Sequence, residues 1–515
     1  MSELKSDTHM GDEFSILFVK LGTHPELSTI AREVTKLTPG IRVIGIGTDE
    51  TTPSDIGEMI AHERDVTLGA FDAWWNEQLF VDPELYLKVV SREGQLLRMA
   101  ERVARHDVYE VRLPGFPVAK FSYDVDGSMQ LLLRQLAFWD WILQKHNVKG
   151  VVFQNIPHNF WDATLHAVVE ARGIPTLCFH EVWPFMKSVY IYEHPLSMGD
   201  LSHGKKLLTE ASHRYGMIPD SLGRRDRMWK QVSVGEAVRS RQVGSGSTMG
   251  VSSRIRSLFR RPGQVSGKAL RAIRRRRQLR ETSRDYEAAV TALRFPERFV
   301  FMEMQRSANM TTLVKGYMYG DPREMVAHVA DSLPVGYTLV VRESSRSGSS
   351  RGARREKFWV QISSIPHVQV ISSEVDTKEI LAVASGMIEL GYSSLALEGI
   401  NRGLPVVVLG LTHLQGAPNA FIVNRPSELR MVMGRALNEP PLRQLNQEEL
   451  EAGLRAWADE TMQSTLEGRL SSHRDKSDES DSAYGTRIVG NTARVVAAWC
   501  ELRVRNLSQS TSKTP

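Results

Sequence analysis

The sequence predicts an α/β protein with two Rossmann-like, doubly wound parallel sheets, one in each half of the chain. The 515 residues exceed what one hydrophobic core usually organises, so two or more domains are expected. Short, continuously apolar runs alternate with stretches of helical periodicity in both halves. Continuously apolar strands are typical of parallel sheets that helices cover on both faces.

In the first half, the opening strand, helix and second strand form the start of a βαβ unit. Strands are expected at residues 15–22, 41–49, 148–155 and 174–182. Apolar residues recur at helical spacing around residues 29–37, 84–106, 128–145 and 157–173. Gly173 is expected to close the last of these helices.

The second half repeats the alternation. Strands are expected at residues 298–305, 337–344, 368–373, 386–391 and 405–410. The segments between them, at residues 321–333, 355–364, 377–384 and 393–403, are the expected helices. Near the end of the chain, a polar run at residues 474–485 precedes an apolar-periodic helix at residues 486–506.

These patterns suggest boundaries along the chain. We expect a disordered N-terminus (1–12), an N-terminal Rossmann-like domain (13–240), a basic linker (241–295), a C-terminal Rossmann-like domain (296–470), and a polar loop with a last helix (471–515). The two domains are expected to face one cleft.

Composition favours a folded protein without a membrane span. Hydrophobic residues make up 41% of the chain and charged residues 24%, which is too apolar for global disorder. No apolar stretch approaches the roughly 18 residues of a spanning helix, and the first residues are polar where a signal peptide is apolar. We therefore expect a cytoplasmic protein. Cys178 and Cys500 are the two cysteines, and we interpret them as buried or incidental thiols.

The positive charge is confined to one segment. Residues 254–284 carry twelve Lys or Arg and one Glu, although the whole chain has a net charge of only +5. Basic amphipathic helices of this kind bind anionic membrane surfaces, which would make the protein peripheral at the inner membrane face. A solvated linker is the alternative. Aromatic residues are nearly absent among the arginines, so we do not expect nucleic-acid binding.

In the second half, the most informative loop follows the strand that ends at Gly391. Ser393 and Ser394 are expected to open a helix whose exposed amides attract phosphate. Glu398, on the same helix, is a candidate acceptor for ribose hydroxyls. An ordinary serine cap with a surface glutamate is the alternative interpretation.

In the first half, polar residues follow three strands. His24 comes after the first, His158 after a later one, and His180 with Glu181 ends the next. A histidine or a carboxylate at a strand end is a candidate base for deprotonating an acceptor hydroxyl. Loop histidines also serve as simple hydrogen-bonding or capping groups.

Other motifs are absent or weak. The chain has no P-loop, GxGxxG, HExxH or GxSxG pattern, so the corresponding ATPase, dehydrogenase, metalloprotease and hydrolase functions lack support. Asp124 and Asp126 form a DxD, but their position before Gly127 favours a turn over a magnesium site. We expect no metal and no cofactor.

Four runs together resemble the capsule polysaccharide biosynthesis proteins, a family that includes the transferases adding Kdo to bacterial lipid anchors. They are PHNFWDATLHAVVEARGIPTLCFHE, FMEMQRSANMTT, DPREMVAHVADSLPVGYTLVVRE and GYSSLALEGINRGLPVVVLG, within residues 150–410. The resemblance implies a GT-B-like fold, with a nucleotide-sugar donor in the C-terminal half and the acceptor in the N-terminal half. It assigns Ser393, Ser394 and Glu398 to the nucleotide-binding loop, and Gln305, Thr311 and Thr312 to the family's polar loop after the first C-terminal strand.

One departure from the family concerns the donor phosphate. The family places a His-Pro pair after the strand that corresponds to YTLVVRE, whereas this chain has Arg342, Glu343 and two serines there. We expect Arg342 or Arg346 to take the place of the histidine, because a guanidinium binds phosphate bidentately.

The resulting hypothesis is a glycosyltransferase of capsule or cell-surface polysaccharide biosynthesis. Its partners would be a nucleotide-sugar donor, which is the substrate, and a glycan or lipid-linked acceptor. A nucleotide-sugar 2-epimerase is the alternative enzyme. A catalytically silent nucleotide- or glycan-binding scaffold is the alternative from another class, and the missing His-Pro pair supports it.

Overall fold

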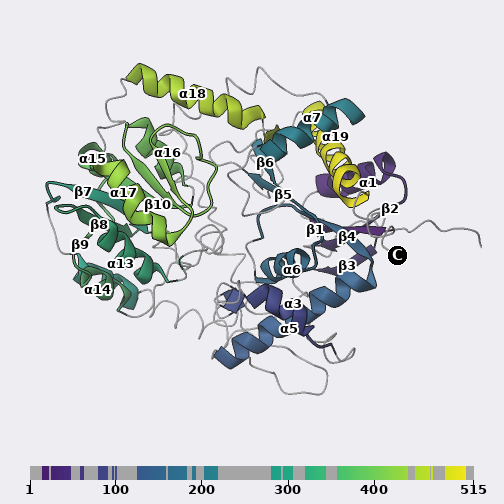
Figure 1. Cartoon of the computed structure of the whole chain (residues 1–515), viewed down its shortest axis with the longest axis horizontal. Helices are drawn as coiled ribbons and strands as arrows, with labels where there is room; N and C mark the ends of the chain where they lie inside the picture. Colours follow the sequence, from purple (N-terminus) through teal and green to yellow (C-terminus); the bar gives the residue numbers. More distant parts are fainter. Residues whose placement is uncertain are drawn as a thin grey trace, which may run out of the picture. The chain divides into compact units, whose positions relative to one another are not determined.

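In a computed structural model, the chain forms two compact α/β units (Figure 1). The first unit comprises residues 1–225 and 459–515, and the second comprises residues 226–458. The structure describes residues 14–21, 25–47, 58–62, 79–90, 96–97, 99–100, 125–157, 160–181, 188–192, 202–217, 280–290, 294–304, 319, 321–343, 357–391, 393–438, 447–463, 465–467 and 482–505.

The first unit contains a seven-stranded sheet in the order β13-β6-β5-β4-β1-β2-β3. Its strands are β1 (Phe14–Leu21), β2 (Ile41–Gly47), β3 (Glu58–His62), β4 (Val148–Phe153), β5 (Thr176–Glu181), β6 (Ser188–Tyr192) and β13 (Thr465–Glu467). The strands from β5 to β3 run parallel, whereas β6 is antiparallel to both of its neighbours. From β3 to β6 this is the Rossmann strand order, with the sixth strand reversed.

Helices cover both faces of the first sheet, as Figure 1 shows. One face carries α1 (Pro25–Leu37), α7 (Ser202–Tyr215) and α19 (Ser482–Trp499), and the other carries α3 (Pro83–Val89), α5 (Val125–Lys145) and α6 (Phe160–Ala171). Gly173 follows α6 with a φ of +66°, which confirms the predicted helix end. Asp126 lies within α5, so the turn predicted at this DxD is wrong.

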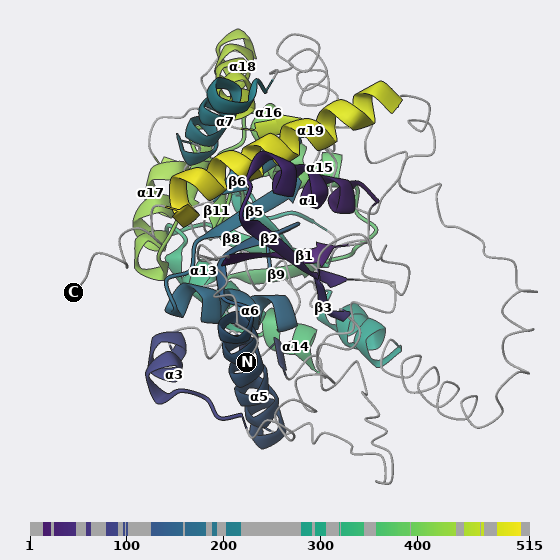
Figure 2. The same cartoon turned by 90° about the vertical axis from the view of Figure 1, so that its right-hand side faces the viewer.

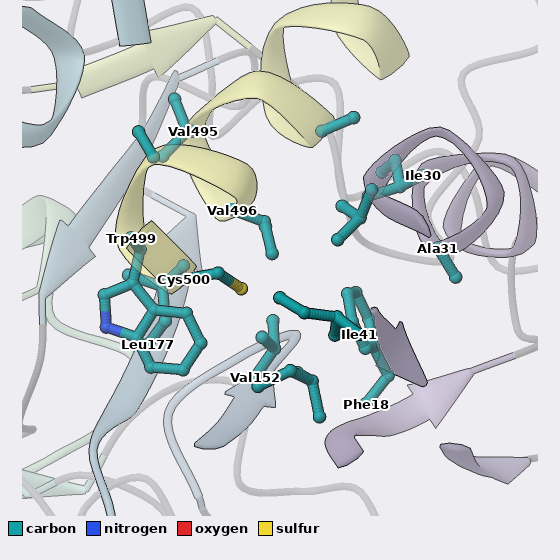
Figure 3. Close-up of a cluster of buried hydrophobic side chains, with 14 of the residues drawn as sticks. Phe18, Ile30, Ala31, Ile41, Val152, Leu177, Val495, Val496, Trp499 and Cys500 are labelled. Carbon is teal, nitrogen blue, oxygen red and sulfur yellow. The ribbon is translucent and has the colours of Figure 1, made fainter. Parts of the chain in front are cut away.

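The end of the chain returns to the first unit. Figure 2 shows α19 lying along the sheet between α7 and α1. A π-helical turn, Cys500–Arg505, follows α19. Trp499 and Cys500 are fully buried in one apolar cluster with Val152 and Leu177 (Figure 3). Because β13 also pairs with β6, the predicted second-domain boundary at residue 470 is corrected.

The second unit contains a six-stranded sheet in the order β12-β11-β10-β7-β8-β9. Its strands are β7 (Phe299–Met304), β8 (Thr338–Glu343), β9 (Val368–Ile371), β10 (Gly386–Leu390), β11 (Val406–Leu409) and β12 (Ala420–Val423). Every pairing in this sheet is parallel. Read from β9 to β12, the order is again 3-2-1-4-5-6, the Rossmann order.

Two layers of helices enclose the second sheet. On one face, α13 (Pro322–Ser332), α14 (Phe358–Ser363) and α17 (Leu429–Asn438) share an apolar cluster with alternate residues of the strands. The other face carries α15 (Thr377–Val383) and α16 (Ser394–Asn401). Asp321 and Asp376 cap α13 and α15 by accepting backbone N–H bonds. A short 3₁₀ turn (Pro426–Glu428) precedes α17, and α18 (Gln447–Gln463) follows it.

The last part of the predicted linker belongs to the second unit. Residues 280–289 are helical, and Val290 pairs with Val370 beside β9. Tyr286 donates a hydrogen bond to the carbonyl of Ile371 at 2.5 Å and accepts one from the backbone of Glu343 at 3.2 Å. Burial raises the pKa of the Tyr286 phenol to about 12. The linker boundary at residue 295 is therefore corrected, while most of the basic segment 254–284 lies outside the described residues.

The predicted fold class is confirmed, because both units are Rossmann-like α/β layers. Within the described ranges, no helix is both long and apolar enough to cross a membrane.

Candidate functional site

The strand order of each sheet indicates where a ligand binds. In both sheets the first strand lies beside the fourth, β1 beside β4 and β7 beside β10. Successive connections leave this point in opposite directions, and open α/β sheets bind ligands there, beyond the carboxyl ends of the strands. The polar groups around these two switch points are therefore the candidates for ligand binding.

At the second switch point, α16 begins just after β10. Gly391 has a φ of +69°, a left-handed conformation that favours glycine. Ser393 is the N-cap of α16, and its Oγ accepts hydrogen bonds from the amides of Leu395 and Ala396, both at 3.2 Å. Ser394 is the first helical residue. The cap therefore occupies two of the helix amides that were expected to bind phosphate.

Glu398 lies one turn into α16 and is 8% exposed. Its Oε1 is 3.7 Å from Nη2 of Arg402, four residues further along the helix. The structure thus brings Gly391, Ser393 and Glu398 together on one loop and helix. Their contact with a nucleotide stays a prediction.

Arg342 lies in β8 and is 2% exposed. Its Nη1 donates to the carbonyl of Val375 at 2.6 Å, and its Nη2 donates to Thr377 Oγ1 at 2.7 Å. Nη2 also forms an ion pair with Glu303 of β7, at 2.5 Å. Phosphate binding by Arg342 would require these internal bonds to break, so the geometry favours a positioning role.

Two buried polar residues near this switch point escaped the sequence analysis. Thr412 and His413 follow β11 and are 3% and 1% exposed. The Oγ1 of Thr412 accepts a hydrogen bond from the amide of Leu414. Gly410, with a φ of +88°, ends β11 as Gly391 ends β10, and this repeated glycine was the available signal.

In the first unit, His180 is buried near the carboxyl end of β5. Its Nδ1 lies 2.9 Å from Oδ1 of Asn155, which follows β4. The same Oδ1 accepts the backbone N–H of Ile156 at 2.8 Å, which identifies this atom as the amide oxygen. Nδ1 of His180 must therefore donate, so in the neutral ring Nε2 is the basic nitrogen.

The cysteine beside this site is not a nucleophile. Cys178 lies two residues before His180 in β5 and is fully buried. Burial raises the pKa of its thiol, and the carboxylate of Asp162 raises it further. Because the thiolate is the reactive form, Cys178 is an inert core residue, as predicted. Cys500 is likewise a buried thiol.

The remaining predicted residues are not brought into this geometry. His24, His158, Gln305, Thr312 and Asp124 lie outside the described residues. Glu181 is the last residue of β5, and its side chain lies outside the described part of the structure, as does that of Ser394. Among the described residues, no group of three His, Cys, Asp or Glu is arranged to hold a metal ion.

The chain matches no protein-family profile and no curated protein sequence. Among solved structures, it is similar to UDP-GlcNAc 2-epimerase from Methanocaldococcus jannaschii, with 10% identity, a TM-score of 0.26, and coverage of 86% of this chain and 98% of the other. The calicheamicin glycosyltransferase CalG4 has 11% identity, a TM-score of 0.24, and coverages of 88% and 95%. MurG from Acinetobacter baumannii has 10% identity, a TM-score of 0.21, and coverages of 86% and 94%. Because TM-scores this low carry no functional argument, the strand order and the site residues are the basis for assigning a function.

Proposed function

We propose that the chain is a nucleotide-sugar-dependent glycosyltransferase of capsule or cell-surface polysaccharide biosynthesis. The second unit binds the nucleotide sugar at its β7–β10 switch point, and the first unit binds the acceptor and supplies the base. The observation that carries the proposal is the His180–Asn155 hydrogen bond, at 2.9 Å. This hydrogen bond holds His180 in one tautomer near the carboxyl end of β5, at the edge where Rossmann-type sheets bind ligands.

The chemistry assigned to His180 is general-base catalysis. Nε2 takes the proton of an acceptor hydroxyl while the hydroxyl oxygen forms a bond to the anomeric carbon of the donor sugar. The bond between that carbon and the nucleotide phosphate breaks, and the phosphate oxygen leaves with the electron pair. A positioned base of this kind contributes about 10²- to 10⁴-fold to a rate. Asn155 acts through His180 by fixing which nitrogen is basic.

The donor site uses the start of α16. A helix N-terminus favours a negatively charged phosphate. Ser393 satisfies the amides of Leu395 and Ala396, and we assign the Ser394 amide, at the front of the helix, to the phosphate. Glu398, which is nearly buried beside Arg402, accepts hydrogen bonds from the ribose.

Product analysis tests the proposal. The purified protein is incubated with UDP-, GDP-, CDP- and CMP-activated sugars and with lipid-linked or glycan acceptors. Transfer releases free nucleotide in proportion to acceptor, whereas a 2-epimerase returns an isomeric sugar nucleotide and releases none. Epimerisation without transfer would contradict the proposal.

The base is tested by His180→Ala. We expect kcat to fall by about 10²- to 10⁴-fold, with binding of the nucleotide sugar unchanged because the donor site lies in the other unit. Asn155→Ala should lower kcat as well, since either tautomer then becomes available. The matched control is His213→Gln, at an exposed histidine of α7. Full activity in His180→Ala would exclude this residue as the base.

A catalytically silent nucleotide-binding scaffold is the second candidate. The internal bonds of Arg342 favour it, because the residue that replaces the family's His-Pro pair is engaged within the protein. Both candidate functions require nucleotide binding. A thermal-shift screen distinguishes them from a protein that binds no nucleotide. A nucleotide at 100 times its Kd stabilises the fold by about 2.7 kcal/mol. Stabilisation without turnover on any donor would favour the scaffold.

A further inference from the structure

Charged residues form one row across the centre of the second sheet. Arg342 of β8 pairs in register with Glu303 of β7. Met302 of β7 pairs with Ile388 of β10, so the next position beside Glu303 is Glu389. This row lies one residue before the carboxyl ends of β7 and β10, at the switch point. Side chains alternate along a strand, and the intervening residues Met302 and Ile388 belong to the apolar cluster of the opposite face.

The two members of the Arg342–Glu303 pair differ in exposure. The Arg342 side chain is 3% exposed and that of Glu303 is 19% exposed. The guanidinium is fixed by Val375, Thr377 and Glu303, and its carbon lies 5.2 Å from the ring centroid of Phe301. A buried guanidinium with this many partners stays in place. Its positive charge compensates the negative charge of the Glu303 carboxylate.

Glu303 retains capacity to accept hydrogen bonds. The ion pair uses Oε1, and no described residue donates a hydrogen bond to Oε2. A carboxylate accepts hydrogen bonds at both oxygens. Hydroxyl groups of a ligand suit such an acceptor, whereas a second carboxylate would place a like charge beside it. Glu389, the next residue in the row, is only 1% exposed. Its carboxyl supplies no positive charge to attract a carboxylate of the ligand.

We propose that Glu303 selects the sugar of the donor by accepting hydrogen bonds from its hydroxyl groups. The preferred sugar is neutral and rich in hydroxyls, and a sugar that carries a carboxylate is disfavoured. Arg342 is the positioning residue that holds Glu303 at the switch point. This inference rests on the proposed function, since it assumes that the second unit binds a nucleotide sugar.

Matched ligand pairs test the selection by isothermal titration calorimetry. UDP-glucose is compared with UDP-glucuronate and GDP-mannose with GDP-mannuronate, because the members of each pair differ only in one hydroxymethyl or carboxylate group. We expect the wild type to bind the neutral member at least about tenfold more tightly, equivalent to about 1.4 kcal/mol. Glu303→Gln removes the charge, so the preference should fall toward unity.

Two further variants control the experiment. Glu374→Gln changes an exposed glutamate of the same unit and should leave the preference intact. If Glu303→Gln does not fold, the double variant Glu303→Met, Arg342→Met replaces the whole pair, since apolar replacement of both partners is often tolerated. It should lose the preference in the same way.

The outcomes separate this inference from the proposed function. Equal binding of both members of a pair by the wild type, or an unchanged preference in Glu303→Gln, would overturn the role of Glu303 and leave nucleotide-sugar binding intact. Failure of the wild type to bind any of the four ligands would overturn this inference, and failure to bind CDP- and CMP-activated sugars as well would overturn the proposed function with it.

Discussion

Single residues near the strand ends are engaged in hydrogen bonds within the protein. Ser393 caps α16 with two hydrogen bonds to backbone amides, and Arg342 is bonded to three neighbours inside the second unit. Polar residues that a strand-end pattern assigns to a ligand can therefore be engaged by the protein. Mutational tests must measure folding and binding separately.

The serine cap gives a prediction about stability. Ser393→Ala should destabilise the second unit by about 1 kcal/mol, because two amides of α16 lose their acceptor. Ser393→Gly should cost only a few tenths of that amount, since glycine is itself acceptable at this position. Urea unfolding of both variants measures the difference. Full stability of Ser393→Ala would mean that the cap hydrogen bonds contribute little.

The nucleotide loop gives a separate prediction about binding. Glu398→Ala and Ser394→Ala should weaken nucleotide binding, because the first loses the proposed ribose acceptor and the second loses a hydroxyl at the helix end assigned to the phosphate. Both should remain folded. Calorimetry with each nucleotide that binds the wild type is the measurement, and unchanged affinity in both variants would show that the nucleotide lies elsewhere.

One surface cluster predicts a pH dependence. Arg172, at the end of α6, donates to Asp140 of α5 at 2.7 Å and to Asp82, the N-cap of α3, at 2.9 Å. The backbone N–H of Glu84 lowers the pKa of Asp82 most, and Arg172 lowers it further. A folded-state pKa below the unfolded value contributes stability that is present above about pH 4 and lost as the pH falls through the folded pKa.

Unfolding at a series of pH values tests this dependence. In Asp82→Asn the urea midpoint should fall less steeply between about pH 5 and pH 2 than in the wild type. Asp331→Asn, in an exposed pair with Arg430, serves as the control and should follow the wild type. A wild-type slope in Asp82→Asn would exclude this carboxylate as a source of acid sensitivity.

At the scale of elements, α19 packs the end of the chain into the first unit. It lies against α1 and α7, and the residues at its end enter the apolar cluster of the first unit. Trp499 is fully buried there. Gly150 of β4 makes room for it, since a Cβ at this position would lie 2.8 Å from both Trp499 Cη2 and Ile16 Cδ1.

Substitutions at this contact predict large effects on stability. Trp499→Ala should destabilise the first unit by about 3–5 kcal/mol through the cavity that it leaves. Gly150→Ala should cost about 1–3 kcal/mol through overpacking. The matched control is Gly434→Ala in α17, where an added Cβ meets no atom within 4 Å, and it should stabilise by up to about 1 kcal/mol. Destabilisation of similar size by both glycine substitutions would contradict the packing explanation.

For the whole molecule, the charge distribution predicts a partner. The segment 254–284, with a local balance of +11, should bind anionic vesicles, because each basic residue near such a surface contributes about 1 kcal/mol. Neutralising Arg274 to Arg277 should reduce co-sedimentation with the vesicles at low salt, and high salt should abolish it. The control replaces four exposed lysines by glutamine, at Lys36, Lys88, Lys205 and Lys206. Equal partitioning of the wild type and the arginine variant would mean that the segment is a solvated linker and not a membrane-binding element.

Local patterns in the sequence were enough to establish the fold class and most of the central strands. Strand β11 is continuously apolar, and β4, β7 and β10 each carry one charged residue among apolar and glycine residues. Such strands are typical of sheets that are covered on both faces, and this local property is visible without a structure. The same patterns located the α16 loop, since Gly391 and Ser393 mark a turn and a helix cap through their own chemistry.

How distant segments combine became visible only in the folded chain. That β13 and α19 complete the first unit depends on packing between residues hundreds of positions apart, which no local pattern encodes. The same reason applies to the site. Asn155, which follows β4, is hydrogen-bonded to His180 of the neighbouring strand β5. Glu303 meets Arg342 because β7 and β8 pair in this register. The sequence offered His180 and Arg342 as candidates, but strand pairing decides which partners they meet, and burial decides which side chain remains for a ligand.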